Sequence, residues 1–208
     1  MEDLKGTNLS RAAIGNIRSK TVRNPLQVSY FSAAPFRYGA SKVMRFFVEP
    51  AKKTEQLKFS DEEIKNLDPD YLAKALKTSM IKKTGENKEP IRFNFMVQVI
   101  GQRQLEIGGA NLIENASIAW DEKNYPSVKF DTFKVATVSI PAVDENDAPD
   151  FVDACKPLRF TPWHALEAHE PLGGINRLRK PVYCASGEFR GGTDAADSRT
   201  RCQEGRYQ

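Results

Sequence analysis

Ile91-Arg92-Phe93-Asn94-Phe95-Met96-Val97-Gln98-Val99-Ile100 is the stretch that decides the fold class of this chain. Apolar and polar side chains alternate along its first residues, and a period of two predicts a β-strand with one covered face. The apolar face would carry Phe93, Phe95, Val97 and Val99, and the other face Arg92, Asn94 and Gln98. We therefore expect one long strand here, around which the rest of the fold is arranged.

Two further stretches predict strands. Residues 42–48 combine alternation with a pair of phenylalanines before Pro50, and residues 133–140 are rich in β-branched side chains up to Pro141. A helix is expected after Asp70, where apolar residues recur at helical spacing. These residues are Tyr71, Leu72, Ala75, Leu76 and Met80. Three long strands separated by a helix and loops predict an α+β chain built on antiparallel strands.

Local signals mark other elements. Ser60 and Glu63 form a capping-box pattern at a helix start, and a turn is expected at residues 85–87. Short helices are expected at residues 150–154 and 181–190, and the second would carry its proline in the first turn, where proline is tolerated.

The domain organisation follows from composition along the chain. We interpret residues 1–190 as a single domain. Residues 191–208 contain Gly, Asp and Arg but little that is apolar, so a disordered tail is expected there.

The composition excludes several classes of protein. Of 208 residues, 40% are hydrophobic and 28% charged, which is typical of a globular domain with a core. The net charge of +4 comes from basic residues interspersed with acids, which favours a solvated surface over a nucleic-acid interface. No apolar run reaches the ~18 residues of a membrane span, and the N-terminus lacks a secretory core, so a cytoplasmic protein is expected. Three cysteines without a C-x-x-C pair favour a reducing compartment and no zinc site.

Arg179 and Tyr183 form the candidate chemical pair. Their spacing is about one helical turn, so the two side chains can meet on one face. A free phenol has a pKa near ~10, and a guanidinium beside it favours the phenolate, a hard anionic oxygen that ligates iron in some haem proteins. Arg190 follows about two turns after Tyr183, so it would share this face and could hold a haem propionate.

The surroundings of this pair resemble a known family. The C-terminal part contains Phe160-Thr161-Pro162-Trp163-His164-Ala165-Leu166, Pro171-Leu172-Gly173, Asn176-Arg177-Leu178-Arg179 and Val182-Tyr183. The N-terminal part contains Tyr30-Phe31-Ser32-Ala33-Ala34-Pro35-Phe36-Arg37-Tyr38-Gly39, followed by Lys42. Between them stand Ile118-Ala119-Trp120, Tyr125-Pro126 and Val135-Ala136. In this order, residues 20–190 resemble the C-terminal half of the small haem catalases and catalase-like peroxidases.

The resemblance implies a fold, a cofactor and a substrate. The family's strands form a closed eight-stranded antiparallel β-barrel, of which this chain would contain about half, with helices on the proximal side of the haem. Tyr183 would ligate the haem iron, Arg179 would keep its phenol charged, and Arg190 would anchor a propionate. The substrate would be hydrogen peroxide or an organic peroxide, used together with a small reductant.

If half of the family's barrel is missing, two consequences are expected. An unclosed half barrel has open strand edges, so self-association is expected, most of all along residues 91–100. The family places a distal histidine and asparagine in an N-terminal region, but no histidine precedes His164 here. No residue is therefore assigned a catalytic role, and we interpret Met1 as the start of a truncated chain, with a short relative that has lost its distal side as the alternative. The resemblance implies a haem-dependent catalase or peroxidase, and the alternative is a non-catalytic remnant that binds haem weakly or not at all.

Three other residues have alternative explanations. His164 and His169 do not share a helical face, so hydrogen-bonded loop histidines are favoured over metal ligands. Cys184 could ligate haem as a thiolate. Adjacent helical residues point about 100° apart, so Cys184 and Tyr183 cannot both bind one iron. The resemblance favours Tyr183.

Overall fold

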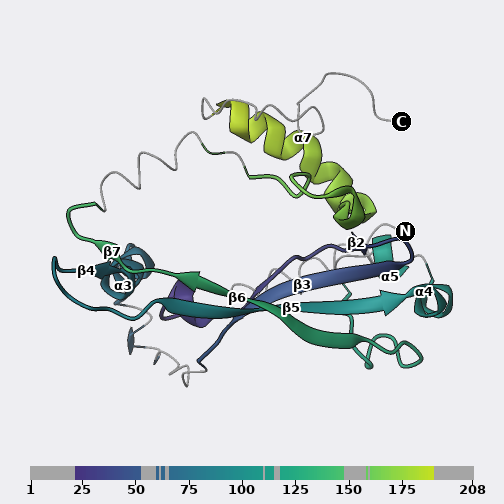
Figure 1. Cartoon of the computed structure of the whole chain (residues 1–208), viewed down its shortest axis with the longest axis horizontal. Helices are drawn as coiled ribbons and strands as arrows, with labels where there is room; N and C mark the ends of the chain where they lie inside the picture. Colours follow the sequence, from purple (N-terminus) through teal and green to yellow (C-terminus); the bar gives the residue numbers. More distant parts are fainter. Residues whose placement is uncertain are drawn as a thin grey trace. The chain divides into compact units, whose positions relative to one another are not determined.

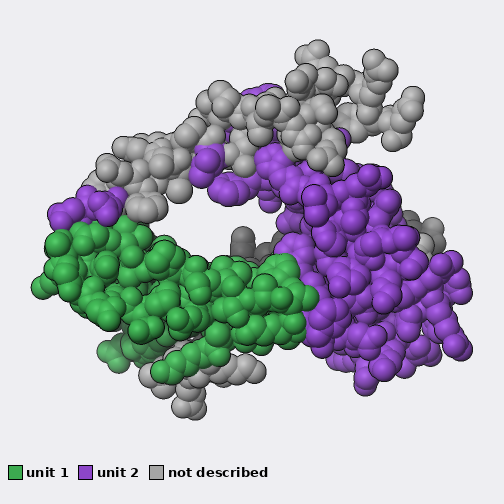
Figure 2. Space-filling model, in the orientation of Figure 1, with its two compact units in different colours: residues 1–31, 47–96, 134–145 green, residues 32–46, 97–133, 146–208 purple. Residues whose placement is uncertain are grey.

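The computed structural model describes residues 22–52, 60, 62–63, 66–109, 111–114, 118–147, 158 and 160–189. The chain divides into two compact units, which Figure 2 shows in different colours. Unit 1 comprises Met1–Phe31, Phe47–Met96 and Lys134–Glu145, and unit 2 comprises Ser32–Phe46, Val97–Phe133 and Asn146–Gln208. Each of the three long strands therefore contributes residues to both units.

Five strands form one antiparallel sheet, in the order β1-β3-β5-β6, with β2 also paired to β3 (Figure 1). They are β1 (Tyr30–Phe31), β2 (Phe36–Tyr38), β3 (Lys42–Pro50), β5 (Ile91–Gly101) and β6 (Asp131–Ile140). The three predicted strands correspond to β3, β5 and β6, and the predicted α+β class is confirmed. Within the described part of the chain, the sheet has two ends and is not closed into a barrel.

The strand β5 lies in the interior of this sheet, with β3 on one side and β6 on the other. Phe93, Val97 and Val99 are buried, as their alternation predicts, and Ile100 is buried with them. The prediction that residues 91–100 are an open edge is therefore wrong. Alternation reports which face of a strand is covered, but not where the strand stands in its sheet.

Along the sequence, the helices lie between and after these strands. They are α3 (Tyr71–Met80), α4 (Gln102–Gly108), α5 (Asn111–Glu114) and α7 (Gly173–Phe189), with short 3₁₀ turns η1 (Pro25–Gln27) and η2 (Glu167–His169). A short parallel pair joins β4 (Ile81–Lys82) to β7 (Val143–Asp144). The helix predicted after Asp70 is confirmed as α3. No helix in the described ranges combines the length and apolar character that crossing a membrane requires.

Two local predictions are confirmed in atomic detail. Ser60 N donates to Glu63 Oε2 at 2.7 Å, and Glu63 N donates to Ser60 Oγ at 3.2 Å, which is a reciprocal capping box. The turn predicted at residues 85–87 is closed by Glu86 N donating to Lys83 O at 2.9 Å.

The helix α7 corrects one prediction. It begins at Gly173 rather than at Pro181, which lies inside the helix. Proline has no N–H, so the carbonyl of Arg177 lacks its usual helical partner. The sequence therefore favoured a helix start at the proline, whereas packing carries the helix through it. Gly173, Asn176 and Gly187 are the buried residues of α7.

The core of unit 2 gathers residues from β3, β5, α5 and the loop before β6. Its buried members are Val43, Ile100, Leu112, Trp120 and Val128. Trp120 stacks on Phe130 with ring centres 5.8 Å apart, and its Nε1 donates to Leu112 O at 3.0 Å. This core and α7 belong to the same unit. The helix predicted at residues 150–154, Arg190 and the predicted tail all lie outside the described residues.

Candidate functional site

The two segments that carry the resemblance, residues 30–39 and 160–183, contact each other within unit 2. Arg37 N donates to Glu170 O at 2.8 Å, and the Arg37 guanidinium lies 2.7 Å from the Glu170 carboxylate. Leu172 N donates to Pro35 O at 2.9 Å, just before α7 begins. Segments far apart in the sequence therefore meet at the base of the helix that bears Tyr183.

Asn176 fixes α7 against the loop that precedes β2. Its side chain is fully buried, and its Nδ2 donates to Pro35 O at 2.9 Å and to Leu172 O at 3.0 Å. Its Oδ1 accepts from Arg179 Nη1 at 3.3 Å. A buried amide is costly unless its polar atoms are paired, so this arrangement restricts α7 to one position on the loop.

Arg179 and Tyr183 lie next to each other on α7. The guanidinium carbon of Arg179 is 5.9 Å from the centre of the Tyr183 ring, which is the outer range of a cation–π contact. Arg179 Nη1 also donates to Ser32 O at 3.3 Å, which ties this cation to the N-terminal family-like segment. Among the described residues, the phenol oxygen of Tyr183 has no hydrogen-bond partner, so it is available to a ligand.

One face of α7 exposes large apolar side chains beside this pair. The exposed side chains are Ile175, Leu178, Val182 and Phe189, the last 93% exposed. At the helical period these four project within about 60° of one another, and Arg179 lies between them and Tyr183. We call these four residues the α7 apolar stripe. An exposed patch of this kind is typical of an interaction or ligand surface.

Two further residues hold the start of α7 to α5. Glu114 accepts from Gly174 N at 2.8 Å and from both terminal nitrogens of Arg177, at 3.2 and 2.9 Å. The Arg177 hydrogen bond is the main cause that lowers the pKa of Glu114 below its usual value. A carboxylate at this point also suits the positive end of the helix dipole.

Within the described residues, His169 and Cys184 are both engaged in contacts or bonds of their own. His169 Nδ1 lies 3.4 Å from Arg37 O, and its ring packs on Tyr38 with centres 6.1 Å apart. Within the described ranges, no group of His, Cys, Asp and Glu could hold a metal ion. Cys184 is disulfide-bonded, which removes it as a thiolate ligand.

Arg45 is a partly buried cation that sequence patterns did not identify. Its guanidinium carbon lies 4.5 Å from the centre of the Trp120 ring, and its Nη1 donates to Ile118 O at 3.0 Å. Burial lowers the pKa of Arg45 to about 10, and the nearby Tyr125 opposes this effect. Alternation along β3 suggests that the Arg45 side chain faces solvent. Its contact with Trp120 in the folded structure is therefore needed to show that the side chain is partly covered.

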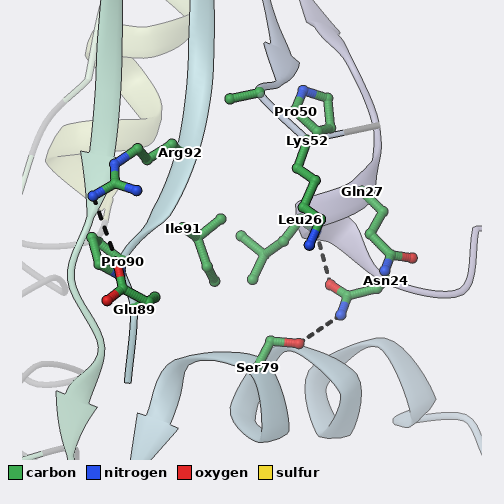
Figure 3. Close-up of a pocket in the computed structure, with 11 residues that line it drawn as sticks. Asn24, Leu26, Gln27, Pro50, Lys52, Ser79, Glu89, Pro90, Ile91 and Arg92 are labelled. Atoms are coloured by element: carbon green, nitrogen blue, oxygen red, sulfur yellow. Dashed lines mark hydrogen bonds and ion pairs between the residues drawn. The ribbon is translucent and has the colours of Figure 1, made fainter. Parts of the chain in front are cut away.

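Unit 1 contains a separate open pocket of about 640 Å³ (Figure 3). Leu26 and Ile91 point toward each other across it, and Lys52 and Arg92 supply positive charge. The lining residues are Asn24, Leu26, Gln27, Pro50, Ala51, Lys52, Ser79, Glu89, Pro90, Ile91 and Arg92. None of them is a Tyr, His, Cys or Met, so the pocket offers no axial ligand for haem iron. It is therefore not the site that the Arg179–Tyr183 pair predicts.

No family model matches this sequence, and no curated protein matches it. The residues around α7 and their geometry are therefore the basis for the proposed function.

Proposed function

We propose that this chain is a catalase-like haem protein in which Tyr183 is the axial ligand of the iron. The observation that carries the proposal is the contact between the two family-like segments. Arg179 reaches Ser32 and Asn176 reaches Pro35, so the helix bearing Tyr183 is held by the other segment that the resemblance singles out. Chance similarity in two separate segments gives no reason for them to meet in this way.

The residues present fit a haem. The Tyr183 oxygen has no described partner, the Arg179 guanidinium lies beside the Tyr183 ring, and the α7 apolar stripe offers a surface suited to a porphyrin. When bound, the haem would supply the iron centre that cleaves the O–O bond of hydrogen peroxide or an organic peroxide. The predicted role of Arg190 on a propionate remains a proposal, because Arg190 lies outside the described residues.

The proposed barrel follows from the same resemblance. Within the described residues, the order β1-β3-β5-β6 is an antiparallel sheet with two open ends and three long strands, β3, β5 and β6, which suits about half of an eight-stranded barrel. Closing it would require further strands on the outer side of β6 or beyond β1.

A non-catalytic role is the second candidate, and one observation favours it. Cleavage of a peroxide needs a group that moves its proton, and histidine commonly does this. The sequence contains two histidines, and His169 is held against Arg37 and Tyr38. The chain could then bind haem through Tyr183 without turning over peroxide.

The ligand assignment is tested by titrating haem into the purified chain and into Tyr183→Phe. We expect the parent to develop the absorption bands of phenolate-bound ferric haem and Tyr183→Phe to lose them, with unchanged circular dichroism. Tyr71→Phe, on α3 in unit 1, is the matched control and should behave as the parent. Identical haem spectra for the parent and Tyr183→Phe would show that another residue, or none, binds the iron.

The role of Arg179 is tested with two substitutions. Arg179→Leu removes the cation beside the Tyr183 ring together with its hydrogen bonds to Ser32 and Asn176, so we expect weaker haem binding and weaker phenolate bands. Arg179→Lys keeps the charge but not the planar fork that reaches Ser32 and Asn176, so its effect should be smaller. Equal haem affinity and equal spectra in Arg179→Leu and the parent would contradict this role.

A further inference from the structure

In the described part of the sheet, β6 is a terminal strand with an open outer edge. Among the described residues, β6 pairs only with β5, so its other edge has no strand partner there. Nine consecutive residues of the strand, 131–139, are exposed. Proteins usually protect such edges with charges, prolines or bulges, because an open edge can pair with another chain.

This edge has little protection. Asp131 and Lys134 are the charged residues of the strand, and it contains no proline. Phe133, Val135 and Val138 are 41%, 47% and 41% exposed, respectively. Phe133 and Val135 are two positions apart, so they project from the same face of the strand.

The strand is also complementary to itself. When a two-fold axis relates two copies of the strand, the copies pair antiparallel. One residue then stands directly opposite its own copy, and the axis passes between the two. With Val135 on the axis, Phe133 faces Thr137, Lys134 faces Ala136 and Asp131 faces Ser139 of the second copy. No like charges meet, and Phe133 and Val135 of both copies form one apolar cluster.

The neighbouring registers are less favourable. An axis through Lys134 places the two lysines of the pair directly opposite each other, which is destabilising. An axis through Ala136 places Phe133 opposite Ser139 and separates the aromatic side chains from Val135 of the other copy. The register centred on Val135 therefore brings the exposed apolar side chains of both copies together without placing like charges opposite each other.

We infer that β6 is a homodimer interface, in which two copies of this chain pair antiparallel along β6 with Val135 on the two-fold axis. The inference does not depend on haem binding.

The register is tested by variants of the full chain that each carry one added cysteine, under mild oxidation. Opposed residues bring their Cβ atoms about 5 Å apart, whereas diagonal ones are about 7–8 Å apart, beyond the usual reach of a disulfide. Val135→Cys should therefore form a covalent dimer, and Lys134→Cys and Ala136→Cys should not exceed the background of the parent. Strongest cross-linking at position 134 or 136 would overturn the register.

The interface itself is tested by sedimentation velocity across a range of protein concentrations. Val135→Lys places two lysines face to face on the axis, so the dissociation constant of the dimer should rise by about tenfold or more. The control is Ile107→Lys on α4, which makes the same kind of change at a residue that is 52% exposed and should leave the dimer intact. A parent that is monomeric at every concentration would overturn the proposal. So would equal weakening by Ile107→Lys. If the protein is monomeric but its β6 amides resist hydrogen exchange, another segment of the same chain pairs with this edge, and the dimer proposal is wrong.

Discussion

Gly173 determines how α7 can begin. Its φ is +83°, in the left-handed region that favours glycine, and a Cβ added there would lie 2.4 Å from the backbone oxygen of Ile113. The obstacle is backbone rather than a flexible side chain, so it cannot move away easily. The close approach allows α7 to pack directly against α5.

We expect Gly173→Ala to destabilise the protein by more than backbone strain alone. The left-handed conformation costs an L-residue about 1–2 kcal/mol, and overpacking against Ile113 adds about 1–3 kcal/mol. Gly85→Ala is the matched control, because Gly85 has a φ of +81° but nothing within 4 Å of the added Cβ. Urea unfolding of both variants measures the difference, and equal losses of unfolding free energy would show that the contact with Ile113 carries no cost.

At the scale of elements, α7 is held at its N-terminal end by α5. Glu114 accepts hydrogen bonds from Gly174 N and the Arg177 fork, and these lower the pKa of its carboxyl group. A lowered pKa in the folded state means that folding favours the charged carboxylate. This stabilisation is complete above the pKa of the unfolded chain and is lost as pH falls through the folded-state pKa.

We therefore expect part of the acid sensitivity of this protein to come from Glu114. Between about pH 5 and pH 3, the unfolding free energy of Glu114→Gln should fall less steeply than that of the parent, because this carboxylate no longer needs to stay charged. Glu106→Gln, at an exposed position on α4, should keep the slope of the parent. Denaturant unfolding at a series of pH values checks this, and parallel curves for the parent and Glu114→Gln would contradict it.

At the scale of the whole molecule, peroxide turnover at the proposed haem site would need a group that moves a proton. His164 and His169 are the histidines of the chain, and both belong to the segment that leads into α7. His169 is occupied by its contacts with Arg37 and Tyr38. No residue has been identified here that would move a proton on the open side of a haem bound to Tyr183.

We expect the haem-loaded chain to release oxygen from hydrogen peroxide little faster than free haem does. General acid–base catalysis contributes about 10²–10⁴ in rate, and that contribution would be missing. Oxygen-electrode measurements on the loaded chain and on free haem at equal iron concentration provide the comparison. Turnover at the rate of an enzyme would contradict this expectation. It would show that the chain contains catalytic groups that neither the motifs nor the geometry identified.

Several features follow from the sequence because they depend on residues only a few positions apart. The alternation in β5, the apolar spacing of α3 and the Ser60–Glu63 capping box are all local, and the structure contains them. The adjacency of Arg179 and Tyr183 is equally local, because it needs only one turn of helix. The strand class and the candidate ligand pair could therefore be predicted.

Other features were decided by tertiary structure alone, because they depend on contacts between distant residues. Asn176 and Pro35 are 141 positions apart, and only their contact explains why a polar side chain is fully buried in α7. Pro181 was a reasonable helix start in the sequence, yet α7 continues through it. An open edge was expected on β5, whereas in the described part of the chain β5 is interior and the sheet ends at β1 and β6, because a strand's own periodicity carries no information about which strands stand on either side of it.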